Sequence, residues 1–77
     1  MKFNSVFDLD LEDKNEVYYN LLIEEDFDFK TKDITIDIKK EEDLLKVFFE
    51  CDSLLDLKIA TNAFVKSLEV IEKSLNV

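Results

Sequence analysis

Residues 34–39 read Ile-Thr-Ile-Asp-Ile-Lys, and residues 45–51 read Leu-Lys-Val-Phe-Phe-Glu-Cys, with the polar run Lys40-Glu41-Glu42-Asp43 before the second of them. Side chains of both runs alternate between a mainly apolar and a mainly polar face, which is typical of half-buried strands. Phe48 is the exception and belongs to the face opposite the core. Because the polar run has no Gly for a tight turn, we expect an antiparallel hairpin closed by four or five residues.

A third strand and a helix are predicted upstream of this hairpin. Residues 3–11 alternate, with Phe3, Phe7 and Leu11 among the apolar positions of one face. From residue 12 the apolar spacing becomes helical and acids crowd the first turn, so a helix is expected over 12–25. Residues 26–32, which include two phenylalanines, fit either an extended connection or the start of the next strand.

A long helix is predicted over residues 53–76, with Ser53 as its N-cap and Asp56 in the position of a capping box. Its main apolar stripe consists of Leu57, Ala60, Phe64, Leu68, Ile71 and Leu75. Further apolar residues lie outside that stripe: Leu54, Ile59, Ala63, Val70 and Val77. A helix on a sheet needs only one apolar stripe, so the surplus indicates that something else packs against it.

The element order is therefore β-α-β-β-α, and residues 1–77 are expected to form a single domain. The natural arrangement is an α+β fold with a three-stranded antiparallel sheet and two helices on one face.

Composition excludes most kinds of chemistry. The chain has no Gly and no His, and its one Cys is Cys51, so phosphate-binding glycine loops, His-based triads and ordinary zinc sites are absent. Cys51 is interpreted as a buried structural thiol. The acidic run 8–13 lacks the Gly of a calcium loop. We therefore expect no enzyme activity, no catalytic, cofactor-binding or metal-binding residues, and no cofactor.

The net charge of −9 argues against direct contact with nucleic acid or with an anionic membrane, because both would repel the chain. No apolar run is long enough to span a membrane, so a soluble cytoplasmic protein is expected. Residues 1–38 hold eleven acids and four lysines, against eight acids and six lysines in residues 39–77. This asymmetry fits either solubility or steering toward a basic partner.

Residues 52–65, Asp-Ser-Leu-Leu-Asp-Leu-Lys-Ile-Ala-Thr-Asn-Ala-Phe-Val, resemble the start of the last helix in the small dimerisation subunit of the KEOPS complex, the CTAG/Pcc family. Leu57, Ala60, Asn62 and Phe64 match that family's pattern. Lys58 stands where the family usually has Arg, and Ala63 where it usually has Ser. The element order is also similar, but the Gly of the family's hairpin and the Pro after its first helix are missing.

The resemblance implies a non-catalytic role. Members of the family pair with themselves or with an acidic accessory paralogue. The net charge of −9 and the missing Gly and Pro leave both roles open for this chain, a homodimeric subunit or the acidic paralogue that pairs with a related dimerisation subunit. Through their helices, members of the family also contact the threonylcarbamoyltransferase subunit, which modifies adenosine 37 of tRNA. On that basis the expected partner-binding residues are Leu57, Lys58, Ala60, Thr61, Asn62, Phe64, Val65 and Leu68. The alternative is a free-standing acidic module, such as an inhibitor, anti-toxin or nucleic-acid mimic, that binds a basic protein.

Overall fold

A computed structural model describes residues 1–25 and 33–75 of the chain. It confirms the α+β fold in the order β-α-β-β-α. The strands are β1 (Phe3–Leu9), β2 (Thr35–Lys40) and β3 (Leu45–Cys51), and the helices are α1 (Asn15–Glu24) and α2 (Leu54–Leu75). Residues 26–32 and Val77, on which parts of the sequence prediction fell, lie outside the described residues.

The three strands form one antiparallel sheet in the order β1-β3-β2, so β3 is central and the other two strands are edges. β1 pairs with β3 from Phe3↔Cys51 to Leu9↔Leu45 without interruption. Four residues separate β2 from β3, and the Glu41 N–H donates to the Leu44 carbonyl at 2.8 Å. The hairpin turn therefore has the length that the sequence predicts.

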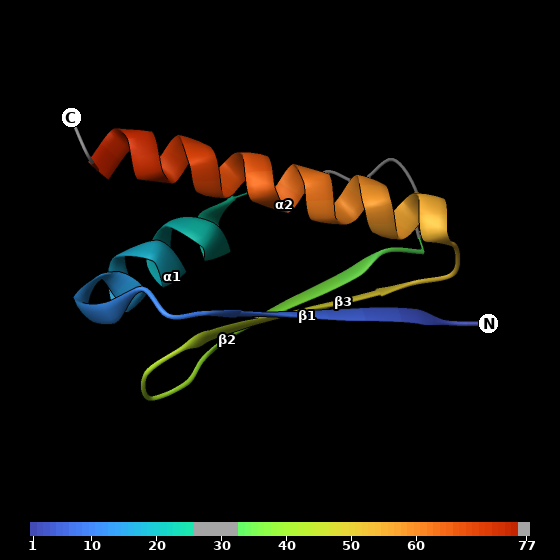
Figure 1. Cartoon of the computed structure of the whole chain (residues 1–77), viewed down its shortest axis with the longest axis horizontal. Coiled ribbons are helices and arrows are strands. Elements are labelled where there is room, and N and C mark those ends of the chain that lie inside the picture. The colour runs from blue at the N-terminus through green and yellow to red at the C-terminus, as the bar shows by residue number, and fades with distance from the viewer. Residues whose placement is uncertain (26–32, 76–77) are drawn as a thin grey trace.

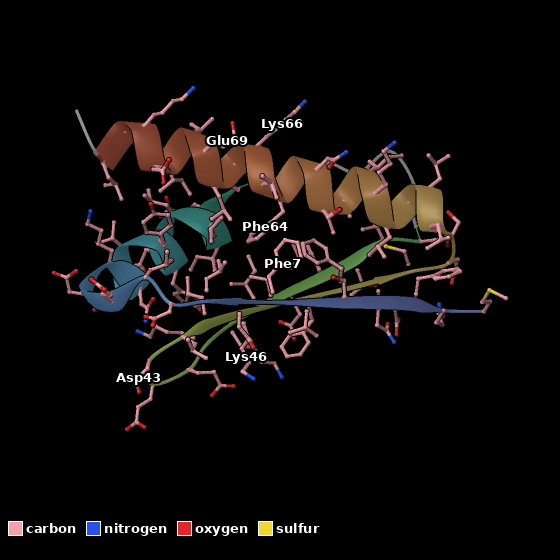
Figure 2. All side chains as sticks on the ribbon, viewed as in Figure 1. Phe7, Asp43, Lys46, Phe64, Lys66 and Glu69 are labelled. Atoms are coloured by element: carbon pink, nitrogen blue, oxygen red, sulfur yellow. The ribbon has the colours of Figure 1, made fainter. Side chains whose placement is uncertain are left out.

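Both helices cover the same face of the sheet, as Figure 1 shows. α2 lies above β3 and β1, and α1 packs on β2. The core between these layers is closed by aromatic rings: Phe7, Phe49 and Phe64 lie with their centroids 5.6 Å apart in all three pairs. Phe7 of β1 and Phe64 of α2 point toward one another in Figure 2.

The first helix starts later than the sequence predicts. A 3-10 turn, η1 (Glu12–Lys14), precedes α1, and β1 ends at Leu9 rather than at residue 11. Glu12 has a φ of 56°, in the left-handed region, which interrupts a continuous α-helix from residue 12. The side-chain oxygen of Asn15 accepts a hydrogen bond from the Leu11 N–H at 3.0 Å and stabilises this junction.

Ser53 caps α2, as predicted. Its Oγ accepts a hydrogen bond from the Asp56 N–H at 3.1 Å, which satisfies one of the unpaired donors at the start of the helix. The buried stripe of α2 consists of Ala60, Phe64 and Ile71. The opposite side of the helix therefore faces away from the sheet.

Candidate protein-interaction surface

The structure divides the eight residues predicted to bind a partner into two groups. Ala60 and Phe64 are fully buried in the chain's own core. Leu57 and Leu68 are half-buried and pack against that core. The Thr61 hydroxyl donates to the Leu57 carbonyl at 2.9 Å, back onto its own helix. Only Lys58, Asn62 and Val65 are exposed, so these three alone offer their side chains fully to a partner.

The exposed apolar residues of α2 form a wider surface than those three. Leu55 and Val70 are 66% and 60% exposed, and Leu54, Ile59 and Val65 are exposed as well. Leu54, Ile59 and Val70 were predicted as surplus apolar positions outside the main stripe, and their exposure confirms that they lie outside it. Leu55 was not among the predicted positions, although it too lies outside the spacing of the buried stripe and is exposed. Ala63 is half-buried.

We call this surface the outward face of α2 and define it by Leu54, Leu55, Lys58, Ile59, Asn62, Val65, Lys66, Glu69 and Val70. Lys66 and Glu69 point away from the sheet in Figure 2. Over its whole length α2 carries three lysines and three acids, so it is neutral in a chain of net charge −9. A protein that approaches this helix therefore meets little of the chain's negative charge.

The outward face continues into a hollow between the two helices. This hollow has a volume of about 370 Å³. Its lining residues are Leu21, Glu24 and Glu25 at the C-terminal end of α1, and Val70, Ile71 and Ser74 of α2. Leu21 is exposed, as are Val17 and Ile23 on the same helix. Helical spacing predicted four apolar positions on this helix, Val17, Tyr18, Leu21 and Leu22. Tyr18 and Leu22 are buried, as expected, whereas Val17 and Leu21 are exposed.

Acidic side chains collect at another part of the molecule, where η1 and α1 meet the β2–β3 turn. A hollow of about 460 Å³ there is lined by Glu12, Asp13, Asn15, Glu16, Lys40, Glu41 and Glu42. The Lys40 ammonium lies 3.7 Å from a carboxylate oxygen of Glu16 and 5.7 Å from the centre of the Tyr19 ring. Among the described residues no group of three His, Cys, Asp or Glu could hold a metal ion.

The sheet has an open face, away from the helices. Val6 and Phe48 lie side by side there, and the Lys39 ammonium lies 5.5 Å from the centre of the Phe48 ring. Phe48 is therefore opposite the core, as predicted. The ammonium of Lys46 on β3 lies 3.8 Å from a carboxylate oxygen of Asp8 on β1. Just beyond the paired ends of the same two strands, the ammonium of Lys2 lies 2.7 Å from a carboxylate oxygen of Asp52. The bond to Asp52 raises the pKa of Lys2.

Cys51 is fully buried on the helix-covered face, which confirms its predicted position. Burial raises the pKa of its thiol, and the carboxylates of Asp56, Asp52 and Glu50 add to the shift. Since the thiolate is the nucleophilic form, this environment lowers the reactivity of Cys51 at neutral pH.

No protein family, no curated protein and no solved structure matches this chain. In the part of the chain that the structure describes, no helix is both long enough and apolar enough to cross a membrane.

Proposed function

We propose that this chain is a non-catalytic subunit that works by binding another protein through the outward face of α2. The observation that carries the proposal is the exposure of Leu55, Ile59 and Val70 on a neutral helix of a strongly acidic chain. Burying such a side chain completely from full exposure contributes roughly 1.5–3 kcal/mol, and covering the exposed part of each of these contributes about half of that. The apolar side chains of this face are bordered by Lys and Glu, and an apolar centre with a polar rim is typical of protein interfaces.

The resemblance to the KEOPS small subunit gives the proposal a specific form. In that form the partner of α2 is the threonylcarbamoyltransferase subunit, and the chain supports modification of adenosine 37 of tRNA in the cytoplasm without touching the tRNA itself. The same resemblance adds pairing with itself or with a related dimerisation subunit. Support comes from the helix motif at residues 52–65 and from the α+β element order.

A binding measurement with purified proteins tests this proposal. Isothermal titration of the chain with the KEOPS threonylcarbamoyltransferase subunit is expected to show binding that Val70→Asp weakens by about tenfold or more, because the variant puts a charge into an apolar contact. Val17→Asp is the matched control. It makes the same chemical change at a residue of α1 that is 43% exposed, and it should leave binding unchanged.

The outcomes separate the two parts of the proposal. Absence of binding by the wild-type chain removes the KEOPS assignment. Capture of the tagged chain from its host, read by mass spectrometry, then identifies the partner, and Val70→Asp can be tested against it. If Val70→Asp and Ile59→Asp bind that partner as tightly as the wild type, α2 is not the interface.

A second candidate function, an acidic module that binds a basic protein, is favoured by the hollow lined by Glu12, Asp13, Glu16, Glu41 and Glu42. Binding there would depend on charge and would weaken steeply as salt is added. Binding through the apolar outward face of α2 would change little with salt. A titration of the captured partner at low and high NaCl concentration therefore distinguishes the two functions.

A further inference from the structure

The open face of the sheet carries a hollow that the proposed function does not use. Its volume is about 410 Å³. Six of its lining residues form two neighbouring cross-strand rows, Val6, Phe48 and Asp37 in one row and Asn4, Glu50 and Thr35 in the next. Figure 2 shows Lys46, which belongs to the adjoining row of this face, pointing away from the helices. The hollow is therefore on the side of the sheet that α2 does not cover.

The centre of this hollow is apolar. Val6 lies opposite Phe48 across the β1–β3 pair. Val6 is 50% exposed and Phe48 is half-buried, so both side chains are in contact with water. A side chain with an apolar stem would remove this surface from water, which favours binding.

Two carboxylates border the apolar centre. Asp37 lies opposite Phe48 on β2, and Glu50 follows Phe48 by two residues on β3, on the same face. Asp37 and Glu50 are thus diagonal neighbours, whose backbones are roughly 7–8 Å apart. A single cationic group placed between them can reach both carboxylates.

The chain's own lysines leave this negative charge incompletely neutralised. In the part of the chain that the structure describes, no lysine forms an ion pair with Glu50. Lys2, just before β1, pairs with Asp52 instead, at 2.7 Å. Asp37 has only a long contact with Lys39, at 3.9 Å between two exposed side chains. The hollow is therefore complementary in charge to an added cation.

From this combination we propose that the hollow binds an arginine side chain of a partner protein. The guanidinium fits between Glu50 and Asp37, because its rigid fork of N–H groups can donate to two carboxylates at once. The apolar stem of the arginine covers Val6, and its planar, weakly hydrated head packs against the Phe48 ring. A free small molecule would stay largely exposed in so open a hollow, so a protein presents the arginine.

Lys39 shows that the Phe48 ring accepts a cation, since its ammonium lies 5.5 Å from the ring centre. Lys39 lies opposite Lys46 in the adjoining row and does not line the hollow. It therefore competes with the arginine for Phe48 and Asp37 without filling the hollow. The outward face of α2 is on the other side of the sheet, so this site does not depend on the proposed function.

Titration of the isotope-labelled chain with short peptides, followed by NMR, tests the site. The end-capped tripeptide Gly-Arg-Gly is expected to shift the amide signals of the hollow most, those of Val6, Asp37, Phe48 and Glu50. Gly-Lys-Gly should bind about threefold more weakly or worse, because an ammonium lacks the planar fork. Gly-citrulline-Gly has nearly the same shape without the charge and should not shift these signals. Equal binding of the three peptides, or shifts confined to other residues, overturns the proposal.

Removal of one carboxylate tests the charge complementarity. Glu50→Gln should weaken binding of the Gly-Arg-Gly peptide by about threefold or more, because an exposed ion pair is lost. Asp8→Asn is the matched control. It removes the same charge from the same face, but from the row beyond the hollow, and should leave the affinity nearly unchanged. The NMR spectrum of each variant verifies its fold, and equal weakening by both would mean that net charge alone attracts the peptide.

Removal of the competing lysine should have the opposite effect. Lys39→Ala is expected to tighten binding of the Gly-Arg-Gly peptide, whereas Lys66→Ala, the same charge change on α2, should leave the affinity nearly unchanged. Unchanged or weaker binding by Lys39→Ala contradicts a site at Phe48. Val70→Asp on the outward face of α2 should bind the peptide as the wild type does, so failure of this proposal and failure of the proposed function are separate results.

Discussion

At the scale of single residues, Phe64 contributes most clearly to stability, because its ring is fully buried and lies 5.6 Å from both Phe7 and Phe49. Phe64→Ala is expected to lower the free energy of unfolding by about 3–5 kcal/mol, through lost burial and the cavity it leaves. Urea unfolding followed by circular dichroism measures this loss.

Phe48→Ala provides the comparison, because it removes the same ring from the half-buried open face. It should cost clearly less than Phe64→Ala. If Phe64→Ala does not fold at all, Phe64→Leu keeps most of the volume and should cost about 1.5 kcal/mol or less. Equal losses from the two alanine variants would mean that the ring cluster is not the centre of the core.

Cys51 makes stability depend on pH. The pKa of its thiol is higher in the folded chain than in the unfolded chain, because burial disfavours the charged thiolate. Above about pH 8.5, where an unfolded thiol ionises, the unfolded state is favoured and stability falls as pH rises. Below that pH the thiol has no such effect.

Cys51→Ala should remove this part of the pH dependence. Urea unfolding at pH 7.5 and at pH 9.5 is expected to show a smaller loss of stability for Cys51→Ala than for the wild type. Lys2, whose pKa is also raised, acts in the same direction but at higher pH, and it is present in both chains. The same loss in both chains would contradict the assignment to Cys51.

At the scale of elements, the cap of α2 is a local feature with a measurable effect. Ser53→Ala removes the oxygen that accepts the Asp56 N–H and should lower the free energy of unfolding by about 1 kcal/mol. Ser74→Ala, at an exposed position near the other end of the same helix, is the control and should change stability by about 0.5 kcal/mol or less. Thermal unfolding of each variant measures these changes. Equal losses of stability in Ser53→Ala and Ser74→Ala would show that the cap contributes nothing.

Periodicity predicted the strands β1, β2 and β3 and the helices α1 and α2 of the described part of the chain, because each has a one-sided pattern of burial. The exceptions are local. The start of α1 was predicted at residue 12, but the backbone of Glu12 takes a left-handed φ, which spacing of apolar residues does not reveal. The side chain of Asn15 accepts a hydrogen bond from the Leu11 N–H at this junction, a contact that the sequence does not reveal. The acids at positions 12, 13 and 16 were compatible with a helix that begins at residue 12 and also with one that begins at residue 15.

The interaction surface was harder to predict than the fold. On α2, apolar residues occur on more than one side, so the sequence shows a surplus but not which side the sheet occupies. The family motif added to the difficulty, since Ala60 and Phe64 match it and are nevertheless core residues. Only the packing of α2 on β3 and β1 separates these two from Leu55 and Val70.

At the scale of the whole molecule, charge is distributed unevenly. Five carboxylates line the hollow near the β2–β3 turn, with Lys40 the one cation among its lining residues. Their mutual repulsion should destabilise the fold at low salt. Glu42→Gln removes one of these charges. It should raise the melting temperature by a few degrees at about 10 mM NaCl, where charges interact over roughly 30 Å, and by much less at 0.5 M NaCl.

Glu69→Gln makes the same chemical change in a different electrostatic environment. Glu69 lies three residues after Lys66 and four before Lys73 on α2, spacings at which opposite charges attract. Its removal should therefore leave the melting temperature unchanged or lower it at low salt. The two variants share the same reduction in net charge, so only the local environment separates them. An equal rise in both would mean that total charge, and not the acidic hollow, limits stability.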